Sequence, residues 1–345
     1  MGASTDVMRA LAVCVPVRNE AARLPRFFES LERLVVPRQT AVTICLLLDS
    51  CTDDSAEIAA GYVSQASYPV HVATTSRADA NAGVARHGAT MLGVAASTTA
   101  DDILITTDAD SWPQSDWLEV TVAALAEAEV IAGNVLRRGQ QHDVAQDRID
   151  QYYARLYALR RHVDPIDWEP AAAHHHASGA NMAMRSSTYM ALGGFAPLTS
   201  GEDARLVDDA ARAGFRVRRD IASVVYTSAR RQGRAQGGLA TTLDLLDRTG
   251  LDHVRVTHPV DQLWQYRHHA QARSAFRTGD LSGVAAALHL STDHVRGVAR
   301  DCPNGEALAM RIVPIAPHGM RQVSLSVAES ALADLIADAD PAQAA

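Results

Sequence analysis

The sequence contains no lysine, and this absence excludes one large class of nucleotide-binding enzymes. All 32 of its basic residues are therefore arginines. The phosphate-binding loop of Walker-type nucleotide hydrolases needs a lysine that reaches the phosphates of the nucleotide. A chain without lysine lacks that loop, so this type of hydrolase is excluded.

Long hydrophobic runs and paired cysteines are also missing. No apolar run approaches the roughly 20 residues that a helix needs to cross a bilayer. The start of the chain, MGASTDVMRA, lacks the basic and then apolar pattern of a signal peptide. The four cysteines include no CxxC pair, so neither a disulfide framework nor a zinc ribbon is indicated. These absences favour a cytoplasmic protein with no transmembrane segment.

The charge and size of the chain limit its partners and its organisation. The formal net charge is −8, which argues against nonspecific binding to nucleic acid. The 345 residues, 47% of them hydrophobic, suffice for one large domain or two modest ones.

Short apolar runs alternate with amphipathic stretches through the first half of the chain. The runs predict strands at Ala10–Val17, Ala41–Leu48, Val70–Thr74, Ile103–Thr107 and Val130–Leu136. The stretches predict helices at Glu20–Leu34, Asp53–Gln65, Gly83–Ala96 and Ser115–Ala128. This alternation predicts an α/β fold with a mainly parallel, Rossmann-like sheet that helices cover on both faces. A dinucleotide-binding fold would place a GxGxxG turn after the first strand, and none is present.

The second half predicts helices at Asp143–Val163 and Glu202–Ala213 and strands at Ala180–Met184 and Phe215–Tyr226. From residue 239 the chain reads as a mostly helical extension, with a looser patch at Cys302–Arg321. We therefore divide it into a catalytic domain, residues 8–238, and a helical region, residues 239–345. The domain comprises a nucleotide-binding half, 8–136, and an acceptor half, 137–238. The helical region is a candidate for acceptor choice or for a homodimer contact.

Polar residues follow the predicted strands, and ligands of parallel sheets bind at the carboxyl ends of strands. Proline cannot donate to a sheet ladder, so we expect the first strand to stop or bulge at Pro16. Backbone groups of the turn that follows can hold a base or ribose; its residues are Pro16, Val17, Arg18, Asn19 and Glu20. Asp49 ends the second strand and is a candidate acceptor for a base N–H or a ribose hydroxyl, while Thr52 and Asp53 read as helix caps.

Asp108 and Asp110 follow the fourth apolar run two residues apart, with Ala109 between them. Residues two apart on a strand share one face, and two such carboxylates repel each other unless a cation is present. A hard divalent ion such as Mg²⁺ or Mn²⁺ fits this pair, with further oxygens from a diphosphate. The alternative is a solvated acidic turn.

Several segments occur in a characteristic order: PVRNE, LDSCTDDS, NAGVARHGA, TTDADSWP, SGANMAMRSSTYMALGGF, GEDARLVDDAARAGFRV and TSARRQGRAQGG. Together they resemble family-2 glycosyltransferases, which are inverting enzymes of the GT-A fold. The resemblance covers about Leu11 to Gly238. It implies a nucleotide-diphosphate sugar as donor and a hydroxyl group as acceptor, with Mg²⁺ or Mn²⁺ as cofactor.

The resemblance also implies roles for individual residues. Asp110 is the first metal ligand, and Asp108 bridges the ribose and the metal. Asp203 is the general base and Glu202 orients it or holds the acceptor, whereas both acids could instead merely complement a helix dipole. The sugar and acceptor region is lined by Gly179, Ala180 and Asn181.

Four arginines complete the expected donor site. Arg230, Arg231 and Arg234 lie in a loop that can close on the diphosphate; the alternative is a solvated basic loop. Arg86 is a candidate for a nucleotide contact and equally for an ion pair with an acidic neighbour. Three consecutive histidines, at 174–176, cannot all face one metal on a regular strand, and we expect at least two of them to be exposed.

The sequence departs from the family pattern in two places. Leu48 occupies a position that is often acidic, so recognition of the base rests on Asp49 and on backbone groups. The arginine loop has no tryptophan of the kind that processive members carry, which favours transfer of a single sugar. Two alternatives stay open: a sugar nucleotidyltransferase, although the chain lacks that class's glycine-rich turn and lysine, and a non-catalytic binding module.

Overall fold

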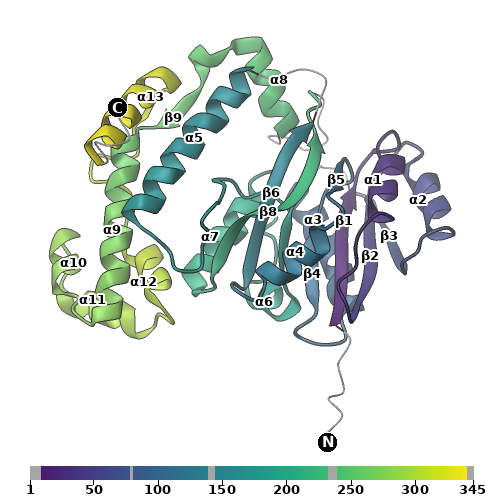
Figure 1. The fold of residues 1–345 in the computed structure, drawn as a ribbon, viewed down its shortest axis with the longest axis horizontal. Helices are drawn as coiled ribbons and strands as arrows, with labels where there is room; N and C mark the ends of the chain where they lie inside the picture. Colours follow the sequence, from purple (N-terminus) through teal and green to yellow (C-terminus); the bar gives the residue numbers. More distant parts are fainter. Residues whose placement is uncertain (1–8, 78–80, 139–143, 232–238, 340–345) are drawn as a thin grey trace, which may run out of the picture. The chain divides into compact units, whose positions relative to one another are not determined.

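The computed structural model describes residues 9–77, 81–138, 144–231 and 239–339. Contacts divide the chain into two compact units (Figure 1). Unit 1 comprises Met1–Gln140, Pro170–Asp209 and Arg216–Thr242, and unit 2 comprises Gln141–Glu169, Ala210–Phe215 and Leu243–Ala345. Residues 141–169, which the sequence analysis assigned to the acceptor half, therefore pack with the C-terminal region in unit 2.

A sheet of eight strands forms the centre of unit 1, in the order β3-β2-β1-β4-β7-β6-β8-β5 (Figure 1). The strands are β1 Arg9–Val17, β2 Thr40–Asp49, β3 Val70–Thr75, β4 Ile103–Thr106, β5 Ser111–Pro113, β6 Val130–Arg138, β7 Met182–Arg185 and β8 Val217–Ser228. The pairs β3-β2, β2-β1, β1-β4 and β6-β8 are parallel, whereas β7 and β5 run antiparallel to their partners. The predicted α/β fold with a mainly parallel sheet is thus confirmed.

The central strands are apolar almost throughout because helices cover them. Val13, Cys14 and Val15 of β1 are completely buried, as are Ile44, Cys45 and Leu46 of β2. The helices are α1 Leu24–Leu31, α2 Ser55–Val63, α3 Ala82–Ala96, α4 Trp117–Ala124 and α6 Ser186–Ala191, with α7 Glu202–Ala213 contributing residues to both units. Helix α3 packs on β1, β2 and β4, and α4 packs on β8 and β6.

Pro16 does not end the first strand, so this prediction is wrong. Strand β1 continues to Val17, and Pro16 stays in register with Leu47 of β2. On its other side the pairing with β4 ends earlier, at Cys14 and Thr106. Proline is tolerated because it lies beyond the last residue that pairs with β4.

Two further details differ from the expectation for unit 1. Helix α1 begins at Leu24 rather than at Glu20, because residues 21–23 form a turn. Asp108 and Asp110 do not lie on a strand: the N–H of Ser111 donates to the Asp108 carbonyl oxygen at 3.0 Å and closes a turn between β4 and β5. The short strand β5 was not predicted, since three residues are too few to show a periodic pattern.

Unit 2 is mostly helical, as predicted for the C-terminal region. Its elements are α5 Val144–Val163, α8 Leu239–Thr249, a 3₁₀ turn at Leu251–His253, β9 Arg255–Thr257, α9 Pro259–Thr278, α10 Ser282–Ala287, α11 Thr292–Arg300, α12 Gly305–Ile312, β10 Gln322–Ser324 and α13 Leu325–Ala339. The residues of α8 up to Thr242 belong to unit 1. Helix α12 lies inside the patch that was expected to be looser, and the antiparallel pair β9-β10 was not anticipated.

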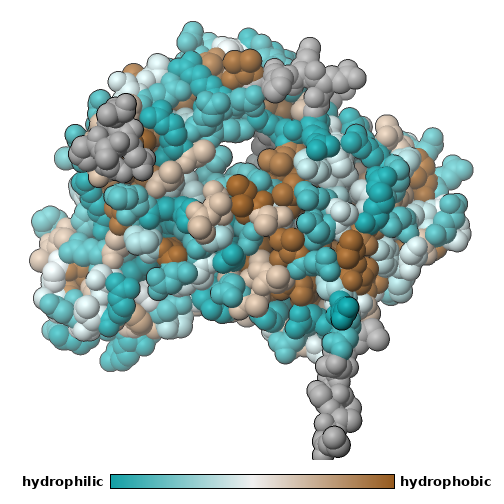
Figure 2. Space-filling view, viewed as in Figure 1, coloured by the Kyte–Doolittle hydropathy of each residue, from teal (hydrophilic) through white to brown (hydrophobic). Residues whose placement is uncertain are grey.

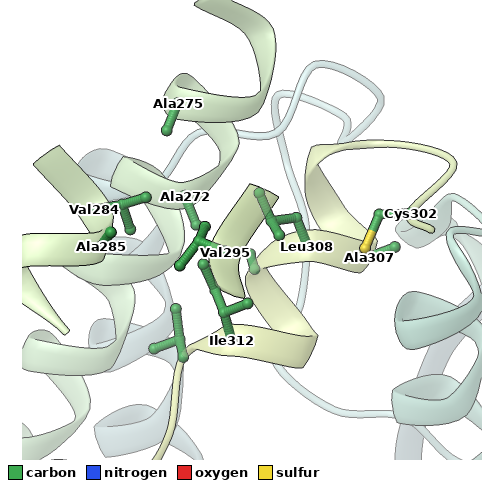
Figure 3. Packing of buried hydrophobic residues seen from close by; sticks show 11 residues of the cluster. Ala272, Ala275, Val284, Ala285, Val295, Cys302, Ala307, Leu308 and Ile312 are labelled. Carbon is green, nitrogen blue, oxygen red and sulfur yellow. The ribbon is translucent and has the colours of Figure 1, made fainter. Parts of the chain in front are cut away.

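Two apolar clusters hold unit 2 together. One gathers side chains of α9 to α12, among them Val284, Val295, Leu308 and Ile312, which point toward one another (Figure 3). The other joins Tyr152 and Leu156 of α5 to α9 and α13. Unit 2 therefore has a hydrophobic core of its own.

Hydrophobic side chains on the molecular face drawn in Figure 2 occur in small groups among hydrophilic ones. Within the described ranges, no helix is both long enough and apolar enough to cross a membrane.

Candidate active site

The ends of β1 and β4 meet at an ion-paired cluster in unit 1. Arg230, which follows β8, donates from Nη1 to Oε2 of Glu20 at 2.8 Å, and its Nη2 lies 2.6 Å from Oε1 of the same carboxylate. The same Nη2 lies 3.1 Å from Oδ2 of Asp110. These side chains are 15%, 5% and 13% exposed for Arg230, Glu20 and Asp110. One guanidinium thus holds two nearly buried carboxylates together.

The environment of Asp110 is unusual for an aspartate. Burial raises the pKa of Asp110 to about 6, and the neighbouring charges of Asp108 and Glu20 act in the same direction, whereas Arg230 opposes them. Burial is thus the main reason that the charged form of Asp110 is disfavoured, and a bound divalent cation would favour that charged form.

Arg86 of α3 forms a second ion-paired cluster. Its Nη1 lies 2.9 Å from Oδ1 of Asp108, and its Nε lies 3.0 Å from Oε1 of Glu202 at the start of α7. Burial disfavours the guanidinium cation, but Asp108 and Glu202 outweigh that effect and raise the pKa of Arg86. The sequence left two roles open for Arg86, a nucleotide contact and an ion pair with an acidic neighbour. The structure shows the ion pair, with Asp108 and with Glu202.

Asp203 is the second residue of α7, two positions after Gly201, whose φ of 77° turns the chain into the helix. Its Oδ2 accepts the backbone N–H of Gly179 at 2.9 Å, and its Oδ1 accepts the N–H of Ala204 at 2.7 Å. Asp203 therefore lies beside the segment that was expected to line the acceptor region.

Asp49, at the end of β2, is 2% exposed and lies between two arginines. Its Oδ2 is 3.4 Å from Nη1 of Arg18, and its Oδ1 is 3.4 Å from Nε of Arg77. Ser50, with a φ of 53°, ties β2 to the end of β3: its Oγ accepts the N–H of Arg77 at 2.8 Å. Sequence reasoning missed Arg77, although it follows the third strand and the strand-end rule could have found it.

The turn after β1 is fixed from the side of β2. Asn19 has a left-handed φ of 54°, and its Oδ1 accepts the N–H of Thr52 at 2.7 Å. The N–H of Glu20 donates to Oγ of Ser55 at 2.8 Å. The side chain of Val17 is fully buried, so only its backbone can reach a ligand.

Asn181 is buried, and its amide is fully used within the protein. Its Nδ2 donates to the carbonyl oxygens of Asn134 and Ser223 at 3.0 and 2.9 Å. Its Oδ1 accepts Nε1–H of Trp117 at 2.9 Å and the Ser223 hydroxyl at 3.4 Å. An amide has two donors and two lone pairs, so this side chain is saturated. Ala180 is also buried, and its N–H donates to Oγ of Ser178 at 3.3 Å.

Two residues of the histidine triplet hydrogen-bond to the backbone of β6. Nε2 of His174 donates to the carbonyl of Ala132 at 3.0 Å, and Nε2 of His176 accepts the N–H of Val135 at 3.2 Å. Burial lowers the pKa of His174 to about 4 and that of His176 to about 2. His174 is buried and the other two are partly buried, so the expectation of two exposed histidines is wrong.

Two of the remaining predicted residues, Ala109 and Arg231, lie within the described ranges. Ala109 is 2% exposed between the two aspartates. Arg231 donates to the carbonyl of Ala229 at 2.9 Å. Arg234 lies outside the described residues.

The carboxylates fit a divalent cation that the substrate helps to hold. The described residues contain no group of three or more His, Cys, Asp or Glu side chains arranged to hold a metal alone. Asp108 and Asp110 offer hard oxygen ligands, and magnesium is commonly bound by one or two carboxylates together with substrate phosphates. This donor set matches that pattern.

Comparison with known proteins decides the family. The sequence model of the family described as "Glycosyl transferase family 2" matches residues 12–188, just over half of the chain. The chain belongs to glycosyl transferase family 2. The matched range of this family contains Asp49, Arg86, Asp108 and Asp110, and it ends before Glu202 and Asp203. Among proteins of curated function, none matches this chain.

Three solved structures that are similar to this family member carry nucleotides or sugars. S. aureus TarS 1–349 in complex with UDP-GlcNAc is 13% identical, with a TM-score of 0.49, and the match covers 94% of this chain and 91% of that one. Mannosyltransferase PcManGT from Pyrobaculum calidifontis, in complex with GDP-Man and Mn²⁺, is 16% identical, with a TM-score of 0.47 and coverage of 89% and 86%. GalNAc-T7 with UDP, GalNAc and Mn²⁺ is 14% identical, with a TM-score of 0.47 and coverage of 90% and 57%. The match spans 44% of the longer TarS crystal structure.

Proposed function

We propose that this family-2 glycosyltransferase moves one sugar from a nucleotide-diphosphate donor to an acceptor hydroxyl with inversion at the anomeric carbon. The observation that supports the proposal is a chain of hydrogen bonds that leads from Asp108 through Arg86 and Gly179 to Asp203. Family membership supplies the reaction class, and these hydrogen bonds join the proposed metal carboxylates to the proposed base.

The nucleotide lies at the ends of β1 to β3 in this proposal. Asp49 with Arg18 accepts hydrogen bonds from the base or ribose, and backbone groups of residues 16–20 line the same end of the sheet. Arg230 leaves its carboxylate partners and neutralises the diphosphate, because a guanidinium fork matches phosphate oxygens. Arg231 lies next to it in the same loop.

Asp203 accepts the proton of the acceptor hydroxyl as its oxygen attacks the anomeric carbon. The bond from that carbon to the diphosphate breaks, and the nucleoside diphosphate leaves. Glu202 orients the site through Arg86. A divalent cation held by Asp110 and Asp108 supplies Lewis-acid stabilisation of the leaving diphosphate when it is bound. Asn181, whose amide is saturated, shapes the acceptor side without contacting the sugar.

The test compares Asp203→Asn with wild type, using hydrolysis of the donor so that no acceptor is needed. A thermal-shift screen of UDP-, GDP- and dTDP-sugars with Mn²⁺ first identifies the donor, because a ligand raises the melting temperature by mass action. We expect Asp203→Asn to lower turnover by about 10²–10⁴-fold, the usual contribution of a general base. The donor dissociation constant should stay within about threefold, since asparagine still accepts the Gly179 N–H.

Asp209→Asn is the matched control, because Asp209 lies on the same helix in a pair with Arg205 whose side chains are 34% and 56% exposed. It should behave as wild type. A wild-type rate for Asp203→Asn would remove Asp203 as the base. Donor binding by the wild-type protein without any turnover would instead identify a binding module.

A further inference from the structure

Arg86 directs three hydrogen bonds, from Nε and Nη1, to acceptors within the protein. It is 7% exposed. Its Nη1 donates to Oδ1 of Asp108 at 2.9 Å and to the carbonyl oxygen of Gly179 at 2.8 Å, and its Nε donates to Oε1 of Glu202 at 3.0 Å. Two carboxylates and one carbonyl therefore fix the plane of the guanidinium.

Both ends of the Gly179 residue are held by groups from distant parts of the sequence. Its N–H donates to Oδ2 of Asp203 at 2.9 Å. Its carbonyl accepts the bond from Arg86 and a second one, at 2.7 Å, from Oγ1 of Thr106 at the end of β4. Movement of Arg86 or Thr106 would therefore move the partner of Asp203.

Only glycine fits at position 179 while Arg86 keeps its place. A Cβ atom built there would lie 2.2 Å from Nε and 2.3 Å from Cζ of Arg86. These guanidinium atoms cannot swing away freely, because three hydrogen bonds hold them. The backbone of Gly179 thus packs directly against the guanidinium.

We infer that Arg86 is a positioning residue that acts through the Gly179 peptide and sets the carboxylate of Asp203 relative to that of Asp108. The inference rests on the proposed function for the roles of the two aspartates. The hydrogen bonds that link Asp108, Arg86, Gly179 and Asp203 do not depend on those roles. In this arrangement Nε and Nη1 of Arg86 bind protein acceptors only. It keeps the donor-side carboxylate and the acceptor-side carboxylate in one geometry.

Arg86→Lys tests geometry while it preserves the charge. A lysine ammonium is a point charge and cannot reproduce the planar fork that joins three acceptors. Gly179→Ala displaces the guanidinium without removing any charged group. Its matched control is Gly61→Ala, because a Cβ at Gly61 would meet no atom within 4 Å.

Thr106→Val is the mildest variant, since it removes one hydroxyl from a site that is 1% exposed. Thr107→Val is its matched control: Thr107 is fully buried next to it, and its Oγ1 has no hydrogen-bond partner among the described residues. This pair tests the Gly179 carbonyl bond in a protein that keeps every charge.

The first readout is amide hydrogen exchange of the segment 177–182, which needs no substrate. Loss of a hydrogen bond that stabilises the segment should speed its exchange by about threefold to tenfold in Thr106→Val. Arg86→Lys and Gly179→Ala should show a larger increase, and both controls should match wild type. Unchanged exchange in Arg86→Lys and Thr106→Val would overturn the inference.

The second readout is hydrolysis of UDP-GlcNAc or GDP-mannose with Mn²⁺. We expect kcat to fall by about 10²-fold in Arg86→Lys, the usual cost of a misplacement of about 1 Å in an active site. Binding of UDP or GDP without metal should remain unchanged. Weaker metal-free nucleotide binding with a preserved kcat would show that Arg86 contacts the nucleotide, which overturns the inference.

The two readouts separate the inference from the function on which it rests. If wild type neither binds nor hydrolyses any donor of the panel, the proposed function fails, and the exchange experiment still decides whether Arg86 holds Gly179.

Discussion

Arg230 contacts Asp110 and Glu20 at the same time, across 120 and 210 residues of sequence. The guanidinium of Arg230 thus lies between two carboxylates, the place where a metal cation held by Asp110 would also lie. If Asp110 binds a metal, Arg230 must yield that position. The arginine is then free to turn to the diphosphate, so that one exchange of partners serves both binding events.

Replacing Arg230 should therefore affect metal and nucleotide in opposite directions. In Arg230→Gln the carboxylates lose their cation, and we expect Mn²⁺ alone to bind about tenfold more tightly, equivalent to one pKa unit of electrostatic free energy. UDP or GDP should bind more weakly, because a cationic partner of the diphosphate is lost. Isothermal titration calorimetry measures both affinities. Arg33→Gln, at an exposed pair with Glu29, is the control; an unchanged Mn²⁺ affinity in Arg230→Gln would contradict the exchange.

The metal itself can be tested by chelation and by substitution of its first proposed ligand. EDTA and Asp110→Asn should each lower donor hydrolysis by at least about 10²-fold, because a Lewis acid contributes several kcal/mol to such reactions. Added Mn²⁺ should rescue the chelated wild type but not the variant. Asp101→Asn serves as the control, since its side chain is 86% exposed. Full activity in EDTA would remove the metal from the mechanism.

The contribution of the hydrogen bond between Trp117 and the buried Asn181 amide to stability can be tested, with Trp112 as the control. Trp117→Phe removes the Nε1–H that donates to Asn181, and a buried group left unpaired costs about 1–3 kcal/mol. Nε1 of Trp112 is buried without a hydrogen-bond partner among the described residues, so Trp112→Phe loses no such bond. For a chain of this size we expect Trp117→Phe to lower the melting temperature by several degrees more, at roughly 2–4 °C per kcal/mol. Equal melting temperatures in calorimetry would refute a stabilising role for the bond.

The buried histidines predict loss of stability in mild acid. The pKa values of about 4 and about 2 for His174 and His176 lie below the ordinary value of 6.5. Between pH 6.5 and 4 the unfolded chain therefore binds more protons than the folded one, so stability falls as the pH falls. We expect a loss on the order of 3–4 kcal/mol between pH 7 and 5 from these two groups together.

Urea unfolding at pH 7 and pH 5 measures this effect. His174→Gln with His176→Gln keeps one donor and one acceptor for β6 but removes the titration, so its stability should change less between the two pH values. An equal change in both proteins would show that other groups cause the acid sensitivity.

The fold of unit 1 was largely predictable because its strands are buried on both faces. Continuous apolar runs such as Leu11–Val15 have no other stable arrangement in a chain with alternating helices. Strand β5 and the pair β9-β10 were not predictable, since three-residue strands carry no periodicity. The assignment of α5 to unit 2 depends on packing of Tyr152 and Leu156 against α9 and α13, which the local sequence does not encode.

The residues of the candidate site could be predicted from the sequence, but their ion-pair and hydrogen-bond partners could not. Strand ends indicated Asp49, Asp108 and Asp110, and family resemblance indicated Asp203. The ion pairs of Arg86 and Arg230 join residues that are 22 to 210 positions apart, and sequence spacing cannot choose among the 32 arginines. The role of Asn181 could not be predicted either. The sequence does not distinguish an asparagine that lines a pocket from one whose amide hydrogen-bonds to two strands.

Strand β7 runs against both β4 and β6, so its first residue, Met182, pairs with Thr106 at the carboxyl end of β4 and with Ala132 in the first half of β6. The chain therefore reaches the end of the sheet that carries the candidate site before β7 begins. The exposed residues 171 and 172, ahead of the histidines that bond to β6, can accept insertions without shifting the register of the strands, because surface connections tolerate insertions. If this segment borders the acceptor site as proposed, insertions there can change the acceptor while the residues proposed to bind the donor keep their places.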